Sequence, residues 1–128
     1  MSQQKVILIV DDEEDILDLL KKKLTARDFQ VYTASRGQEA IDMAKLYNPG
    51  LILMDIVLPD VGGPEVVKTI KEDPRTRHIP VIFLSGIVSK DDHEAETSVH
   101  VDGVRYNALG KPFMFDELYR EVEKIFMN

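Results

Sequence analysis

Three carboxylates of this chain follow apolar stretches in a pattern that could place them in one site. Asp11 and Asp12 come directly after the apolar run at residues 6–10, and Asp55 interrupts a second apolar run at residues 51–58. An ionised carboxylate inside a buried strand is costly. We therefore expect the strand to end at Asp55, so that the side chain lies at the edge of a sheet. The proline and the glycine pair that follow agree with a loop there.

Two further side chains complete the candidate site. Ser85 follows a third apolar run, and Lys111 follows a short predicted strand at residues 106–109. Carboxylates packed together cannot all stay charged unless a cation joins them, and a hard divalent ion such as Mg²⁺ takes oxygen ligands. That ion and Lys111 could neutralise a transferring phosphoryl group, while Ser85 offers a hydroxyl and Asp55 a possible nucleophile. The pattern thus indicates metal-assisted phosphoryl chemistry.

Strands and helices must alternate for these side chains to meet. Apolar or β-branched patterns predict strands at residues 5–10, 29–34, 51–55, 79–84 and 106–109. Helical spacing predicts helices over residues 15–27, 64–72 and 115–126, and one that Ser35 caps and that continues to Tyr47. Residues 89–98 predict only a short, weak helix, because Ala95 is their single apolar member. Such alternation predicts a doubly wound α/β fold with a parallel sheet and ligands at its carboxyl edge.

Length, charge and composition exclude several classes of protein. The 128 residues suit one domain, and 44% of them are hydrophobic, which is enough for a real core. A net charge of −7 argues against nucleic acid as a partner. The absence of cysteine excludes thiolate metal sites and a cysteine nucleophile. There is no apolar signal region or membrane-length run, so we expect a cytoplasmic protein that does not enter the membrane.

Four separated motifs carry a resemblance that spans essentially the whole chain. They are V-D-D-E at residues 10–13, L-I-L-M-D-I-V-L-P at 51–59, F-L-S-G at 83–86 and G-K-P-F at 110–113. With them the chain resembles the receiver domains of response regulators in two-component signalling, of the single-domain chemotaxis type. The resemblance implies a flavodoxin-like sheet of five parallel strands in the order 2-1-3-4-5, with residues 1–128 forming one receiver domain and no effector domain.

The resemblance also implies a metal site. By match with the family's motifs, Asp55 is the phospho-accepting aspartate and Asp12 is a direct ligand of Mg²⁺ or Mn²⁺. Asp11 assists through water, and Val57 gives its backbone carbonyl to the metal.

The same match implies a signalling role. Ser85 corresponds to the switch hydroxyl and Lys111 to the lysine of the family. The family accepts phosphoryl from a histidine kinase or a histidine phosphotransfer protein, and many members accept it from small donors. We expect a phosphoacceptor that catalyses only its own phosphorylation and dephosphorylation, and that presents a changed surface to a downstream protein.

Departures from the family leave two alternatives open. Receivers usually have an aromatic residue three positions before the lysine, where this chain has Ala108, with Tyr106 two positions earlier. The interval from Ser85 to Lys111 is also longer than is usual. A pseudo-receiver that binds partners without being phosphorylated is one alternative. A Mg²⁺-dependent aspartyl phosphohydrolase is the other, and it is less favoured because such enzymes carry a second acid two residues after the nucleophile, where Val57 stands.

Overall fold

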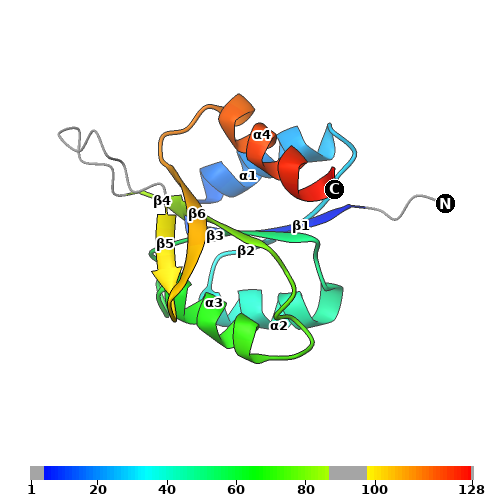
Figure 1. Ribbon diagram of the computed structural model, residues 1–128. Coiled ribbons are helices and arrows are strands. Elements are labelled where there is room, and N and C mark those ends of the chain that lie inside the picture. Colours follow the sequence, from blue (N-terminus) through cyan, green and yellow to red (C-terminus); the bar gives the residue numbers. More distant parts are fainter. Residues whose placement is uncertain (1–4, 87–97, 128) are drawn as a thin grey trace.

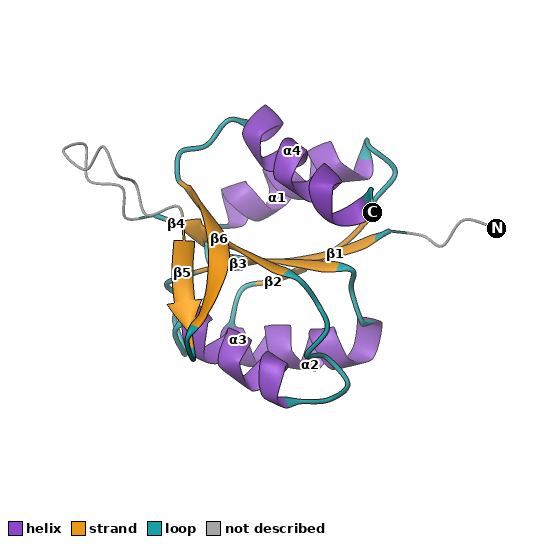
Figure 2. Ribbon diagram, viewed as in Figure 1, coloured by secondary structure: helices purple, strands orange, loops and turns teal. Residues whose placement is uncertain are grey.

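Two layers of helices enclose a central sheet in the computed structural model, which describes residues 5–86 and 98–127. Helices α1 (Glu14–Thr25) and α4 (Phe115–Phe126) cover one face, and α2 (Gly37–Tyr47) and α3 (Gly63–Glu72) cover the other (Figures 1 and 2). No helix within the described ranges combines the length and the apolar character needed to span a membrane.

Six strands form the sheet, in the order β2-β1-β3-β4-β6-β5. Their bounds are β1 (Val6–Val10), β2 (Gln30–Ala34), β3 (Leu51–Asp55), β4 (Val81–Ser85), β5 (Ser98–Val101) and β6 (Val104–Gly110). All neighbours pair in parallel except β5 and β6. The flavodoxin-like doubly wound fold is therefore confirmed, with β6 as the fifth parallel strand. The five predicted parallel strands lie in the predicted order, and β5 adds a sixth, antiparallel strand at the edge that was not predicted.

A two-residue turn explains the extra strand. Asp102 and Gly103 both have positive φ, at 50° and 79°, and they lie between the paired residues Val101 and Val104. Asp-Gly favours a hairpin turn of this kind because glycine and aspartate tolerate positive φ. Val101 then pairs with Val104 and Val99 with Tyr106, which places β5 against β6. The weak helix predicted at residues 89–98 lies outside the described residues, except for Ser98, which begins β5.

The sheet buries both of its faces because successive side chains of a strand point to opposite sides. Ile7 of β1 and Leu53 of β3 belong to the core beneath α1 and α4. Leu8 of β1 and Met54 of β3 belong to the core above α2 and α3. Every residue of β3 is buried. Asp55 is thus the one polar residue of a buried strand, at its carboxyl end.

Helix α1 has the pattern that the sequence predicts. Glu14 and Asp15 lie in its first turn, and Lys22 and Lys23 lie in its last. Charges placed in this way interact favourably with the helix dipole. Its buried residues recur at helical spacing: Leu17, Leu20 and Leu24.

The predicted start of the second helix is wrong. Helix α2 begins at Gly37, after Arg36, and no side chain at its N-cap position caps it. The Ser35 backbone amide instead donates to Glu39 Oε1 at 2.9 Å. The free amides of the first turn are bound by Asp60, a residue of the loop that follows β3. Because that residue is remote in sequence, local capping rules could not identify it.

Candidate functional site

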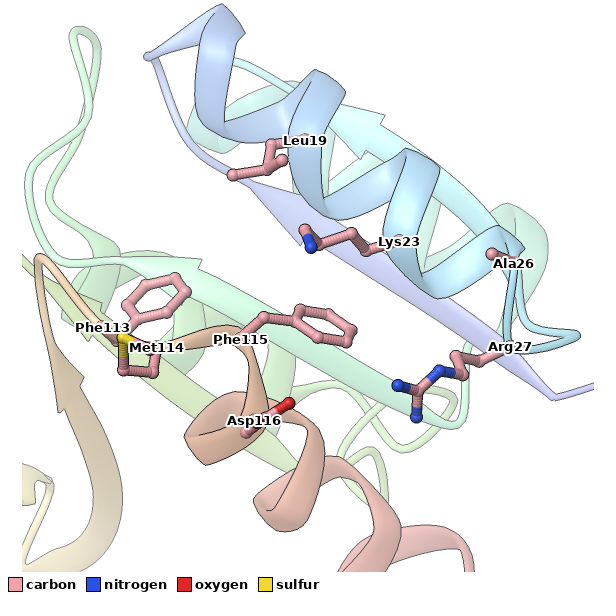
Figure 3. A pocket seen from close by; sticks show the side chains of 8 residues that line it. All are labelled: Leu19, Lys23, Ala26, Arg27, Phe113, Met114, Phe115 and Asp116. Atoms are coloured by element: carbon pink, nitrogen blue, oxygen red, sulfur yellow. The ribbon is translucent and has the colours of Figure 1, made fainter.

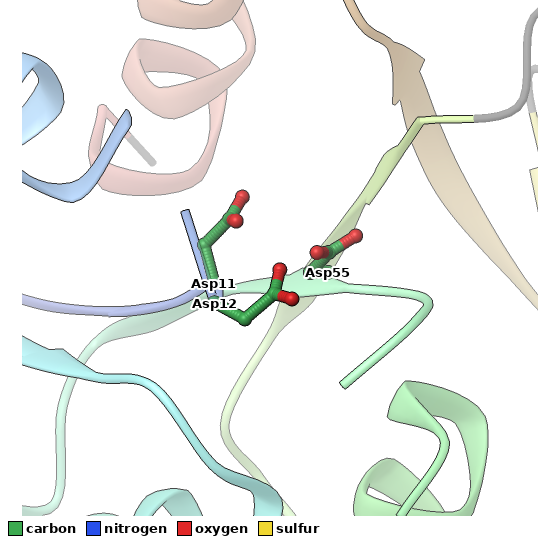
Figure 4. A group of neighbouring side chains, drawn as sticks. All are labelled: Asp11, Asp12 and Asp55. Carbon is green, nitrogen blue, oxygen red and sulfur yellow. The ribbon is translucent and has the colours of Figure 1, made fainter. Parts of the chain in front are cut away.

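The predicted site residues lie at the carboxyl ends of neighbouring parallel strands. Asp11 directly follows β1, Asp55 ends β3, Ser85 ends β4 and Lys111 follows β6. Figure 4 shows Asp11 and Asp12 at the end of β1, beside Asp55 of β3. Parallel pairing brings these ends to one edge of the sheet, where open α/β sheets bind ligands.

Three carboxylates meet closely enough to share one ion. One oxygen from each of Asp11, Asp12 and Asp55 lies within 4.8 Å of the others. Asp11 is fully buried and Asp55 is 5% exposed. Asp12, in contrast, is exposed, so the cluster opens to solvent on that side. Carboxylate oxygens on a partly open edge suit a hard cation that keeps some of its water.

Lys111 places a positive charge among these carboxylates. Its Nζ lies 2.6 Å from Asp11 Oδ2 and 3.5 Å from both Asp55 Oδ2 and Glu13 Oε1. Asp11 Oδ1 accepts a hydrogen bond from the Glu13 backbone amide at 2.9 Å. Apart from its ion pair with Lys111, the buried Asp11 Oδ2 has no partner among the described residues. Its second lone pair is available to a cation or to water.

The electrostatics of the site favour an additional cation. Burial raises the pKa of Asp55 from 3.8 to about 6, with help from the charge of Asp11, while Lys111 and the Val57 backbone amide oppose the rise. Burial disfavours the charge of Lys111, but its contacts with the carboxylates outweigh burial and raise its pKa. The single ammonium group therefore does not fully compensate the acidic cluster. A divalent cation would lower the pKa of Asp55 and keep it ionised.

Ser85 and Val57 lie beside this cluster. Ser85 is 7% exposed, and its backbone oxygen accepts a hydrogen bond from the Lys111 amide at 2.6 Å. A Cβ added at Gly86 would meet no atom of the described residues within 4 Å. Val57 is 59% exposed, two residues past Asp55. The metal-binding role of its carbonyl stays a prediction.

Two residues of the site escaped the sequence analysis. Glu13 belongs to an acidic run that looks like an ordinary helix start, yet its carboxylate lies near Lys111. Gly63 looks like a turn residue, but it packs under the strand end. Its amide donates to the Ile56 carbonyl at 2.8 Å, and a Cβ there would collide with the Asp55 carbonyl oxygen. The proline and the glycine pair predict a loop after Asp55, but they do not predict this contact.

The position of the usual switch aromatic is occupied by a small buried residue. Ala108 is 7% exposed, and Tyr106 lies two residues earlier, on the same face of β6. The Tyr106 ring packs edge-on against Phe83, with centroids 5.9 Å apart, and Lys71 Nζ lies 5.7 Å from its centroid. Tyr106 thus faces α3, one step further from the Ser85 end of the sheet.

A groove lies between α1 and the start of α4 (Figure 3). Phe113, two residues after Lys111, lines it together with Phe115 and the exposed Leu19. Lys23 Nζ lies 5.1 Å from the Phe115 ring centroid. Arg27 lines the groove as well, with its guanidinium carbon 5.7 Å from the same ring centroid, so the groove combines apolar side chains with two basic ones.

Comparison with known proteins identifies the family of this chain. The family model of the response regulator receiver domain matches residues 7–123. The polar-differentiation response regulator DivK of Brucella ovis is 41% identical over 90 residues, which cover 70% of this chain and 73% of that protein.

Solved receiver structures share the fold. A putative response regulator from Chloroflexus aurantiacus has a TM-score of 0.82 and 26% identity, covering 98% of this chain and 100% of its own. The receiver domain of the sensor histidine kinase PA1611 from Pseudomonas aeruginosa, solved with magnesium coordinated in its active site cleft, has the same TM-score and coverage at 24% identity. On its sequence and its fold, this chain belongs to the response regulator receiver family of two-component signalling.

Proposed function

We propose that this protein accepts a phosphoryl group on Asp55 with the help of a bound divalent cation, Mg²⁺ or Mn²⁺. The observation that carries the proposal is the close cluster of Asp11, Asp12 and Asp55 at one sheet edge, with Lys111 beside Asp11 and Asp55. The magnesium in the cleft of the PA1611 receiver domain supports it, as does the similarity to the response regulator DivK.

The residues fit such a cation. The buried Asp11 Oδ2 lacks a second partner among the described residues, and the donor set consists of carboxylate oxygens, which Mg²⁺ prefers. Asp12 and Asp55 would bind the ion directly, Asp11 through water, and Val57 through its backbone carbonyl. When bound, the ion would neutralise charge on the phosphoryl oxygens.

The phosphoryl transfer itself requires an ionised Asp55. Because the pKa of Asp55 is about 6, most of the carboxylate is charged at neutral pH even without metal. One Asp55 oxygen would attack the phosphorus atom and form an acyl phosphate, while the bond from phosphorus to the donor breaks and the donor keeps that electron pair. Lys111 Nζ, already 3.5 Å from Asp55 Oδ2, would neutralise the developing charge. The donor would be a histidine kinase or a histidine phosphotransfer protein.

Phosphorylation would change the surface on the β6 side of the sheet. It would add roughly −1.5 to −2 charges at the end of β3. The Ser85 hydroxyl and the Lys111 ammonium would be drawn toward the new oxygens. Ser85 pairs with Gly110 in the sheet, so movement at these strand ends would be passed to β6 and to the β5–β6 hairpin that it carries. A downstream protein would then recognise the altered surface.

Intact mass after incubation with Mg²⁺ and acetyl phosphate tests the proposal. We expect a single phosphoryl adduct that is absent with Asp55→Ala and in the presence of chelator. Asp18→Ala, which removes an exposed carboxylate of α1, should keep the adduct. No adduct, together with no effect of Mg²⁺ on stability, would favour the pseudo-receiver. Turnover of a free phosphomonoester would favour the phosphohydrolase.

A further inference from the structure

Helix α2 receives its N-terminal cap from a distant loop. Arg36 precedes the helix in an extended conformation and offers no side-chain cap. Asp60 Oδ1 accepts the Gly37 amide at 2.8 Å, and Asp60 Oδ2 accepts the Gln38 amide at 3.1 Å. Both amides would otherwise lack a helical acceptor, and the positive end of the helix dipole favours a carboxylate there. These two bonds lower the pKa of Asp60, so the carboxylate stays charged well below neutral pH.

The loop that carries Asp60 is the one that follows Asp55. Its near end is held by the Ile56 amide, which donates to the Leu84 carbonyl at 3.2 Å, and by the Gly63 amide, which donates to the Ile56 carbonyl at 2.8 Å. Leu58 is buried in the core above α2 and α3. The outer part of this loop, from Pro59 to Gly62, is exposed or partly exposed.

The outer part of the loop also packs closely on α2. A Cβ at Gly37 would collide with Val61 Cγ1 and would lie 2.6 Å from Val66 Cγ2. Only a glycine therefore lets Val61 approach the start of α2 this closely. The Asp60 carboxylate thus holds this stretch of loop on the first turn of α2 through hydrogen bonds. The Val61 side chain holds it there through apolar contact.

We propose that Asp60 is a positioning residue for the metal site, which holds the loop between β3 and α3 on α2 and thereby orients the Val57 backbone carbonyl. This inference rests on the proposed function, because it assigns Asp60 a role toward the cation bound by Asp12 and Asp55. Asp60 itself does not contact the ion. Its role resembles that of outer-shell groups that fix the ligands of a metal site.

The test compares Mg²⁺ affinity among folded variants by titration calorimetry at neutral pH. Asp60→Ala should weaken Mg²⁺ binding about tenfold, and Asp60→Asn should recover part of the loss because its amide oxygen can still accept an N–H. Gln38→Pro removes one donor from the opposite side while remaining compatible with a first helical turn, and it should weaken binding by a smaller factor.

Asp73→Ala is the matched control. Asp73 also accepts a backbone amide, that of Arg75 at 2.9 Å, but it lies at the end of α3 that is distant from the site. This variant should lose some thermal stability and keep Mg²⁺ affinity within about twofold of wild type.

The outcomes separate the two proposals. Wild-type affinity in folded Asp60→Ala would overturn the positioning role alone and leave the proposed function standing. If Asp60→Ala does not fold, wild-type affinity in Gln38→Pro would overturn it. A wild-type protein that binds no Mg²⁺ would overturn both.

Discussion

Asp55 is held in the folded protein at a cost in electrostatic free energy. It is 5% exposed and lies beside Asp11, and burial is the main reason why its pKa rises to about 6. A carboxylate whose folded-state pKa lies above its unfolded-state value stabilises the fold when protonated. That contribution is fully present below pH 3.8, and it is lost as the pH rises through about 6.

Asp55→Asn should therefore stabilise the metal-free protein at neutral pH. The expected gain is about 2–3 kcal/mol above pH 6, because each unit of pKa shift corresponds to about 1.4 kcal/mol. It should shrink progressively between pH 6 and pH 4. Urea denaturation of both proteins in chelator, at several pH values, measures the difference. Asp18→Asn, on the exposed face of α1, is the control. A gain that does not change with pH would show that ionisation of Asp55 is not its cause.

The loop between β3 and α3 combines two kinds of constraint. Close backbone packing holds its near end, where Gly63 lies against the Asp55 carbonyl. Hydrogen bonds to α2 hold its outer part through Asp60. A loop fastened at both places can present a backbone carbonyl in a fixed direction, and metal binding depends on such preorganisation.

Gly63→Ala should disrupt this loop. The new methyl group has no free space, because the colliding atom is a backbone oxygen of a buried strand, so the loss should be about 3 kcal/mol of unfolding free energy. Gly62→Ala is a matched control, since its Cβ would have its nearest contact at 3.9 Å and its φ of −64° suits any residue. It should cost less than about 0.5 kcal/mol. Equal stabilities of the two variants in urea would contradict the packing argument.

The edge hairpin distinguishes the sheet from five parallel strands alone. β5 pairs only with β6 within the described residues, and it also packs near α3. Val101 of β5 and Ala108 of β6 belong to the same core as α2 and α3. The hairpin thus extends the core at the β6 edge of the sheet. This is the edge to which Ser85 and Lys111 would pass the movement that we propose for phosphorylation.

At the scale of the whole molecule, the acidic edge lowers the stability of the metal-free fold. Its three carboxylates come from the ends of two neighbouring strands, so their repulsion acts on the centre of the sheet. The net charge of −7 adds to the same effect. A cation that joins these strand ends would stabilise the fold as a whole.

Mg²⁺ should therefore raise the thermal unfolding midpoint. At a concentration one hundred times its dissociation constant, a ligand specific for the folded state contributes about 2.7 kcal/mol, or about 10 °C for a domain of this size. Calorimetry with Mg²⁺, and with a monovalent salt at equal ionic strength, measures the shift. Asp12→Ala should abolish it and Glu14→Ala, on the first turn of α1, should retain it. An identical shift with the monovalent salt would mean that general screening, not a bound ion, is responsible.

Much of the fold and of the site could be predicted from the sequence. Apolar runs identified the buried strands β1, β3 and β4, and helical spacing identified α1, α3 and α4, because burial imposes these periods on any chain of this class. The polar residues that end those strands had to meet at one edge once the sheet was parallel. The positions of Asp11, Asp12, Asp55, Ser85 and Lys111 follow from that argument. The Asp-Gly turn at residues 102–103 is also a local signal, and it favours the additional β5–β6 hairpin.

Only the tertiary structure decided how the site is supported. The Asp60 carboxylate and the Gly37 amide are 23 residues apart in the sequence. They meet because α2 and α3 pack side by side on one face of the sheet, which brings the loop that leads into α3 against the start of α2 (Figure 1). The pKa of Asp55 likewise depends on how deeply the strand end is buried and on which charges surround it. Periodicity is a property of neighbouring residues and can be read locally. Caps, close approaches and shared charge arise between segments that only folding brings together.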